Sequence, residues 1–168
     1  MLQKKIEEAL NDQINAELWS AYLYLSMSLH FEHEGRKGIA NWYNIQFQEE
    51  QAHALALMEY VNARNGQVLL KPIEEVPTSW ASPLAAFEAT LEHEKKVTQK
   101  INNLYAMAEE AKDFATRQKL NTFVAEQVEE EESVRQIIDD LTLVGEDGTG
   151  LYQIDKELGT RTFVAPTL

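Results

Sequence analysis

The chain has 168 residues, and its 15 lysines and arginines stand against 28 aspartates and glutamates, which gives a formal net charge of −13 with neutral histidines. This length suits one domain with a substantial core. A hydrophobic content of 44% excludes a disordered acidic chain, which lacks the apolar residues needed to offset chain entropy. The surplus of negative charge argues against nucleic acid and against an anionic membrane as partners, because both attract lysine and arginine. The absence of cysteine excludes disulfides, thiolate metal sites and cysteine nucleophiles.

The first residues of the chain give no sign of a targeting segment. Residues 1–8 contain no apolar signal core, and no run approaches the roughly 20 apolar residues of a membrane span. We therefore expect a cytoplasmic protein, and cations are the partners that suit so acidic a chain.

Glycine and proline cluster at a few places and divide the chain into long uninterrupted segments. The breaks fall at residues 35–38, 65–83, 112–113 and 145–150. Between them lie four segments of roughly 30 residues that are rich in alanine, glutamate, leucine, glutamine and lysine, which favour helices. The sequence therefore predicts an all-α protein with four long helices.

The connections between these helices predict their directions. Short loops join the first helix to the second and the third to the fourth, so each pair is antiparallel. The segment 65–82 contains Pro72 and Pro77 and is irregular. At about 18 residues it can run the roughly 40 Å length of a helix, so the second and third helices are parallel. Ser82 is the expected N-cap of the third helix and Pro83 its first residue. The expected topology is an up-down-down-up bundle with one long crossover.

A short amphipathic helix follows the bundle, because Leu151, Ile154 and Leu158 share one face before Gly159. We predict one domain over residues 1–168. It comprises the four-helix bundle at about 3–143, the short fifth helix at about 149–158, and a C-terminal tail at 159–168.

Each long helix has an inward stripe of residues spaced three and four apart, and an acidic residue lies near the middle of every stripe. These residues are Glu17, Glu50, Glu94 and Glu130. A single interior glutamate is commonly a register device or the partner of a buried basic residue. No lysine or arginine occupies any of the four stripes, so four glutamates would face one another at a cost of several kcal/mol each or with strongly raised pKa values. Two divalent cations would balance their charge.

Glu50 and His53 are three residues apart and share a helix face. Glu-x-x-His pairs of this kind bind metal in dinuclear carboxylate proteins built on helical bundles. One imidazole among several carboxylates favours Fe²⁺ or Mn²⁺, whereas zinc more often takes additional nitrogen or sulfur ligands.

Four stretches carry a resemblance to a known family, and they run from Asn15 to Tyr24, Asn41 to His53, Glu92 to Glu94 and Ala125 to Glu130. Over essentially its whole length, the chain resembles the non-haem bacterial ferritins, which are ferritin-like di-iron carboxylate proteins. The resemblance implies that Glu17, Glu50 and His53 bind one iron of a ferroxidase centre. It implies that Glu50, Glu94 and Glu130 bind the other iron, with Glu50 bridging.

The same resemblance implies an activity and an assembly. Fe²⁺ would be oxidised to Fe³⁺ by O₂ or H₂O₂, and a ferric oxyhydroxide mineral would grow inside a hollow shell of 24 identical subunits. Gln127 would lie beside the space for oxygen in this metal site. Tyr24 lies seven residues after Glu17 and would supply an electron or a hydrogen bond to the centre, although an aromatic that only fills the core explains Tyr24 equally well.

A second acidic cluster, Glu49, Glu126 and Glu129, lies one residue away from the inward stripes and reaches the dinuclear pair through Glu130. The resemblance makes it a third iron site. The alternative is a solvated acidic face, because runs of glutamate such as residues 129–132 usually face water.

Departures from related families narrow the expected function. Bacterioferritins bind haem through a methionine directly after the bridging glutamate, where this chain has Gln51, so no haem is expected. Bacterioferritins also carry a second Glu-x-x-His pair on the fourth helix, where this chain has Gln127 and Glu130, so the second iron is expected to bind more weakly. The alternatives are a discrete di-iron or di-manganese oxidase acting on an organic substrate and a DNA-protecting mini-ferritin, whose basic tail this chain lacks. His30, His33 and His93 are expected at the surface.

Overall fold

The computed structural model describes residues 2–168, and these residues form five α-helices and no strand. The helices are α1 (Lys4–His33), α2 (Lys37–Ala63), α3 (Pro83–Glu110), α4 (Phe114–Val144) and α5 (Gly148–Leu158). None of the helices in this described part of the chain is long and apolar enough to cross a membrane. The predicted all-α class, a four-helix bundle followed by a short C-terminal helix, is confirmed.

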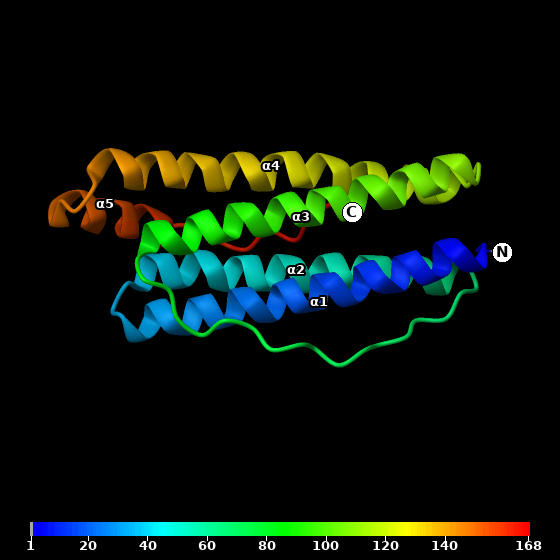
Figure 1. Ribbon diagram of the computed structural model, residues 1–168, viewed down its shortest axis with the longest axis horizontal. Coiled ribbons are helices and arrows are strands. Elements are labelled where there is room, and N and C mark those ends of the chain that lie inside the picture. Colours follow the sequence, from blue (N-terminus) through cyan, green and yellow to red (C-terminus); the bar gives the residue numbers. More distant parts are fainter. Residues whose placement is uncertain (1) are drawn as a thin grey trace.

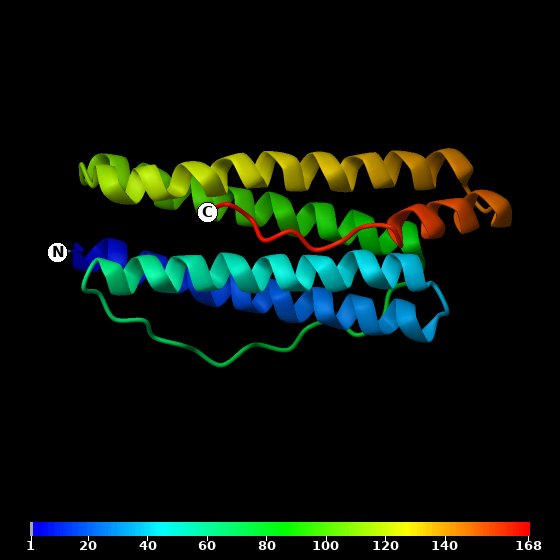
Figure 2. The ribbon, with the colours of Figure 1, turned by 180° about the vertical axis from the view of Figure 1, so that it is seen from behind.

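Two antiparallel helix pairs make up the bundle (Figure 1). The first pair is α1 with α2, and the second is α3 with α4. The segment that connects α2 to α3 runs the length of the bundle along the outside of α1 and α2, so that α2 and α3 point in the same direction (Figures 1 and 2). This arrangement is the predicted up-down-down-up topology with one long crossover.

Local interactions end and start the helices where the chain turns. Gly35 has a φ of +74°, which is a left-handed conformation. It allows the N–H groups that follow α1 to donate hydrogen bonds to the last carbonyl groups of that helix. The Ser82 side chain accepts a hydrogen bond from the Ala85 N–H at 3.0 Å, and Pro83 is the first residue of α3, as the sequence predicts. Asp113 caps α4 in the same way and also forms a two-pronged ion pair with Arg64 at the end of α2, at 3.0 and 3.1 Å.

The crossover is held against α1 by two asparagine side chains. Asn11 accepts a hydrogen bond from the Leu69 N–H at 2.6 Å and donates one to the Gln67 carbonyl at 2.9 Å. Asn15, one turn later, accepts from the Lys71 N–H at 2.7 Å and donates to the Leu69 carbonyl at 2.9 Å. These bonds supply the partners that an irregular backbone lacks, and they fix the path of the crossover.

The hydrophobic core is divided into two clusters along the bundle axis. One cluster contains Tyr24, Tyr43 and Phe87 together with the residues near α5. The other contains Leu10, Leu57 and Phe123 and lies toward the N-terminus of α1. In every long helix the buried stripe glutamate falls between the positions that belong to the two clusters. A polar layer therefore crosses the middle of the bundle.

The short helix α5 packs on the start of α2 and on the end of α4. Leu151, Ile154 and Leu158, the predicted apolar face, pack against the core cluster around Tyr43. The Asp155 carboxylate accepts a hydrogen bond from the Ile39 N–H at 2.9 Å, near the N-terminus of α2. After Leu158 the tail turns back and runs between α2 and α4 toward the middle of the bundle (Figure 2).

The contact between α5 and α2 requires a glycine at position 38. A Cβ atom added at Gly38 would lie 1.5 Å from the Asp155 carbonyl oxygen, whereas one added at Gly148, within α5, would meet nothing within 4 Å. We expect Gly38→Ala to destabilise the protein by about 1–3 kcal/mol, because α5 has to move. Thermal unfolding should show a lower Tm for Gly38→Ala and none of that loss for Gly148→Ala. Equal Tm values for the wild type and Gly38→Ala would contradict this packing.

Candidate metal centre

The polar layer contains one glutamate from each long helix. Glu17, Glu50, Glu94 and Glu130 are all buried, and no exposed fraction exceeds the 8% of Glu130. Within residues 2–168, no lysine or arginine forms an ion pair with any of the four. The bundle thus buries four acidic groups in one layer without a basic partner, as the stripes predict.

Glu17, Glu50 and His53 form the tightest group in this layer. One ligand atom from each lies within 4.8 Å of the other two. Glu50 and His53 face the same way because they are three residues apart on α2, and the distance from His53 Nδ1 to Glu50 Oε2 is 3.6 Å. Glu17 Oε2, Glu50 Oε2 and His53 Nε2 are buried and have no hydrogen-bond partner among the described residues.

These three unpaired atoms indicate what the group can bind. Buried polar atoms normally have hydrogen-bond partners, because leaving one unpaired costs about 1–3 kcal/mol. Two carboxylate oxygens and one imidazole nitrogen that converge without a donor fit a divalent cation. The donor set of this chain therefore fits a borderline-hard metal ion such as Fe²⁺.

Glu94 and Glu130 lie outside this group of three, and neutral donors hold both of them. Glu94 accepts hydrogen bonds from the Tyr24 hydroxyl and, at 3.1 Å, from the Gln127 side-chain amide. Glu130 accepts one from the Gln46 amide at 2.9 Å. The structure thus places the expected ligands of the second metal in the same layer and satisfies them with side-chain donors.

Burial and mutual repulsion raise the pKa values of these carboxyl groups. Burial is the main cause for Glu17 and Glu50, followed by the neighbouring carboxylate, Glu50 in the first case and Glu94 in the second. For Glu94, burial and then the charge of Glu130 raise the pKa to about 8. The metal-free site therefore holds protons near neutral pH, and a cation that binds there has to displace them.

The predicted third cluster lies partly at the surface. Glu49 and Glu126 are half-buried, whereas Glu129 is exposed. Burial raises the pKa of Glu49 to about 7 and also raises that of Glu126. Glu49 forms an ion pair with Arg161 of the C-terminal tail at 2.7 Å. The three side chains do not form a compact metal-binding group among the described residues.

Tyr24 and Gln127 both contact the layer. Tyr24 is fully buried, and its ring stacks on Tyr43 with a distance of 6.0 Å between the centroids. Burial and the charge of Glu94 raise the pKa of its hydroxyl. The Gln127 amide contacts Thr98 at 3.3 Å in addition to Glu94. Both side chains are placed to orient Glu94, and Tyr24 also belongs to the core.

Some contacts of the site do not follow from the inward stripes. The Gln13 amide donates a hydrogen bond to Glu17 Oε1 at 2.8 Å. The two residues are four apart on α1, and this spacing is the one sequence feature that could have predicted the contact. The contacts of Gln46 and Arg161 have no local signal in the sequence. His33 is exposed, but the expected surface position is wrong for His30 and His93, which are both half-buried. The His30 ring packs on Trp80, and His93 lies 2.8 Å from the Ser20 hydroxyl.

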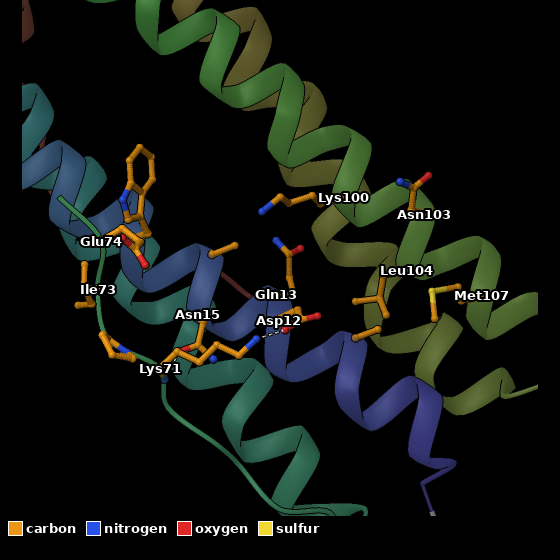
Figure 3. A pocket seen from close by; sticks show the side chains of 14 residues that line it. Asp12, Gln13, Asn15, Lys71, Ile73, Glu74, Lys100, Asn103, Leu104 and Met107 are labelled. Carbon is orange, nitrogen blue, oxygen red and sulfur yellow. Dashed lines mark hydrogen bonds and ion pairs between the residues drawn. The ribbon is translucent and has the colours of Figure 1, made fainter. Parts of the chain in front are cut away.

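A surface cavity of about 680 Å³ lies outside the layer, between α1, α3 and the crossover (Figure 3). Gln13 is among its lining residues, and so are the basic residues Lys71 and Lys100. The carboxylates of the polar layer do not line it. This cavity is therefore separate from the candidate metal centre, although its lining residue Gln13 also contacts Glu17.

The four-helix topology and the buried glutamate–histidine group define a helical-bundle carboxylate protein with a candidate dinuclear metal centre. A family model described as "Ferritin-like domain" matches residues 7–144. A bacterial non-heme ferritin of Bacteroides fragilis (strain 638R) is 44% identical over 161 residues, which cover 96% of this chain and 100% of that protein. One from Staphylococcus aureus (strain MRSA252) is 39% identical over 163 residues, covering 97% of this chain and 98% of that protein.

Solved structures agree with these sequence relatives. An open-pore ferritin from the hyperthermophilic archaeon Archaeoglobus fulgidus is 51% identical, with a TM-score of 0.95 over 96% of this chain and 100% of that chain. A closed form of that ferritin, engineered by mutagenesis, has a TM-score of 0.96 over 98% of this chain and 100% of that chain. The chain belongs to the ferritin family, and the resemblance to non-haem bacterial ferritins is confirmed.

The raised pKa of Glu94 predicts how the stability of the metal-free protein depends on pH. The folded state holds a proton up to about pH 8, whereas an unfolded glutamate releases it near its ordinary value of 4.5. The stabilisation from this proton is fully present below that ordinary value and is lost as pH rises through about 8. Glu94→Gln removes the titrating group, so its Tm should exceed that of the wild type by about 5 °C at pH 9 and by little at pH 5.

Thermal unfolding in the presence of a chelator measures this difference. The matched control is Glu92→Gln, because Glu92 lies on the same helix but is exposed and pairs with Lys95. The Tm difference between Glu92→Gln and the wild type should not increase as the pH rises. A Tm difference for Glu94→Gln that stays constant from pH 5 to pH 9 would show that Glu94 does not hold a proton in the folded protein.

Proposed function

We propose that this protein is an iron-storage ferritin that oxidises Fe²⁺ to Fe³⁺ at a dinuclear ferroxidase centre within each chain. Membership of the ferritin family supports iron storage. The observation that carries the ferroxidase proposal is the set of three buried, unpartnered ligand atoms on Glu17, Glu50 and His53. Glutamates without basic partners surround this set, and two ferrous ions would supply four positive charges to four carboxylates.

Each residue of the layer has a role in this proposal. Glu17, Glu50 and His53 bind the first iron. Glu50, Glu94 and Glu130 bind the second, and Glu50 bridges the two ions. Because Glu94 and Glu130 already accept hydrogen bonds from neutral side chains, the second iron has to compete with those donors, and we expect it to bind more weakly. Tyr24 and Gln127 orient Glu94 on the side of the second iron.

The reaction is a redox reaction of bound substrate ions. Two ferrous ions together give up two electrons, which with two protons from the solvent reduce O₂ to H₂O₂ or one H₂O₂ to two water molecules. The protons held on the glutamates leave when Fe²⁺ binds, so that ligands and substrate carry matching charges. The two apolar clusters on either side of the layer limit the access of water to the ions.

The stored product belongs to an assembly rather than to one chain. We propose a hollow shell of 24 identical subunits, which the likeness to the archaeal ferritin structures supports. Ferric iron leaves the centre for the interior and is deposited as a ferric oxyhydroxide mineral. Glu49, Glu126 and Glu129, with Glu130, form the proposed third iron site beside the centre. The half-buried positions of Glu49 and Glu126 favour this assignment over a purely solvated face.

Replacing one ligand tests the ferroxidase proposal. His53→Ala removes the only nitrogen ligand, so the initial rate of aerobic Fe²⁺ oxidation should fall by on the order of 100-fold. The matched control is His33→Ala, which removes an exposed imidazole at the end of α1 and should leave the rate unchanged. Stopped-flow absorbance of the ferric product measures both rates, and circular dichroism verifies that both variants are folded.

Sedimentation after aerobic iron loading tests storage with the same proteins. The wild type and His33→Ala should sediment as dense shells that hold far more iron than the few ions of the binding sites. A small species with only two metals per chain would indicate a discrete oxidase instead. If His53→Ala oxidises Fe²⁺ at the wild-type rate, the proposed centre is refuted.

A further inference from the structure

The C-terminal tail brings an arginine into the third acidic cluster. After α5 the tail runs back beside α2 (Figure 2), and the Arg161 guanidinium donates to Glu49 Oε2 at 2.7 Å. Its other terminal nitrogen donates to the Gln46 side-chain oxygen at 2.6 Å. Glu49 is one of the proposed ligands of the third iron, so a cation of the chain itself already occupies part of that site.

The contacts of Arg161 also reach the dinuclear centre. Gln46 is fully buried, and it receives the Arg161 bond on its oxygen while its amide nitrogen donates to Glu130 Oε2 at 2.9 Å. Glu130 is a proposed ligand of the second iron and adjoins the third cluster. One guanidinium therefore binds Glu49 of the cluster directly and reaches the adjoining Glu130 through a buried amide.

The position of Arg161 is built into the fold and is not a loose surface pairing. Its guanidinium lies over the Trp42 ring at 4.9 Å from the centroid. The Asn41 amide donates to the backbone carbonyls of Leu158 and Arg161 at 3.2 and 3.0 Å. The exposed fractions of the two paired side chains are 28% for Arg161 and 17% for Glu49. These contacts come from α2, which also carries Glu49 and Glu50.

We propose that Arg161 is the resident counter-cation of the third acidic cluster and that iron at the third site has to displace it. This inference rests on the proposed function, because it takes Glu49, Glu126 and Glu129 as an iron site. A carboxylate oxygen that accepts the guanidinium cannot at the same time bind a ferrous ion, and two cations on one group of carboxylates repel each other. Docking of the tail and iron at the third site are therefore competing states.

This competition has two consequences for iron. The third iron binds more weakly than the carboxylates alone would allow, which suits a transient position between the dinuclear centre and the mineral. By reciprocity, iron at the third site weakens the docking of the tail by the same factor. Arg161 touches no iron in this scheme and is a positioning residue that sets the affinity of one site.

Anaerobic titration calorimetry of the assembled protein with Fe²⁺ alone tests the proposal. Arg161→Gln removes the charge and shortens the side chain but leaves it polar, so the third binding event should become about tenfold tighter while the first, at Glu17, Glu50 and His53, stays unchanged. Arg161→Lys keeps the positive charge with fewer hydrogen-bond donors, so the affinity of its third site for Fe²⁺ should lie close to that of the wild type. The matched control is Arg117→Gln, because Arg117 is partly exposed and pairs with Glu109 near the junction of α3 and α4.

Each outcome of the titration decides the inference. An unchanged third event in Arg161→Gln, or no third event in that variant, would overturn it. An equal tightening of all three events, or the same effect in Arg117→Gln, would show only a change in overall charge and would also overturn it. The first two events and the oxidation rate report on the proposed function separately. Loss of those events in the wild type would refute the ferroxidase centre, whatever Arg161 does.

Discussion

Four carboxyl groups buried in one layer without a basic partner are the constraint on which the rest of this structure depends. An isolated buried carboxylate is strongly disfavoured, so the buried carboxyl groups of the metal-free chain remain protonated to a higher pH. The raised pKa values of Glu17, Glu50 and Glu94 indicate this. The two apolar clusters on either side of the layer supply the stability that allows the bundle to carry this cost. In the proposed function, cations of the right size and charge relieve this cost.

The side chains around the layer divide it into two unequal halves. Glu17, Glu50 and His53 keep unpaired ligand atoms, whereas Glu94 and Glu130 are held by Tyr24, Gln127 and Gln46. In the proposed function, a first metal ion displaces only protons from its ligands, whereas a second also has to exchange hydrogen bonds for coordination. Strong binding at one position and weak binding at the other suit a site that releases its oxidised product rather than a site that keeps a permanent cofactor.

The sequence predicts the parts of this protein that depend on periodicity and on loop length. The helical stripes identify Glu17, Glu50, Glu94 and Glu130 as interior residues, and the length of the segment 65–82 predicts parallel α2 and α3. Tertiary contacts without a local pattern could not be predicted. Gln46 meets Glu130 across 84 residues of sequence and Arg161 meets Glu49 across 112, because α5 and the tail fold back on α2. His93 lies off the stripe yet is half-buried, since the Trp19, Ser20 and Tyr24 side chains surround it.

The central claim is that cations replace protons on the buried carboxyl groups. Anaerobic titration calorimetry of the wild type with Fe²⁺ at pH 7, repeated in two buffers that differ in ionisation enthalpy, measures the number of protons released per bound ion. The account predicts two ferrous ions bound in the dinuclear centre of each chain and more than one proton released as they bind. Binding without proton release, or no binding in the centre, would contradict it.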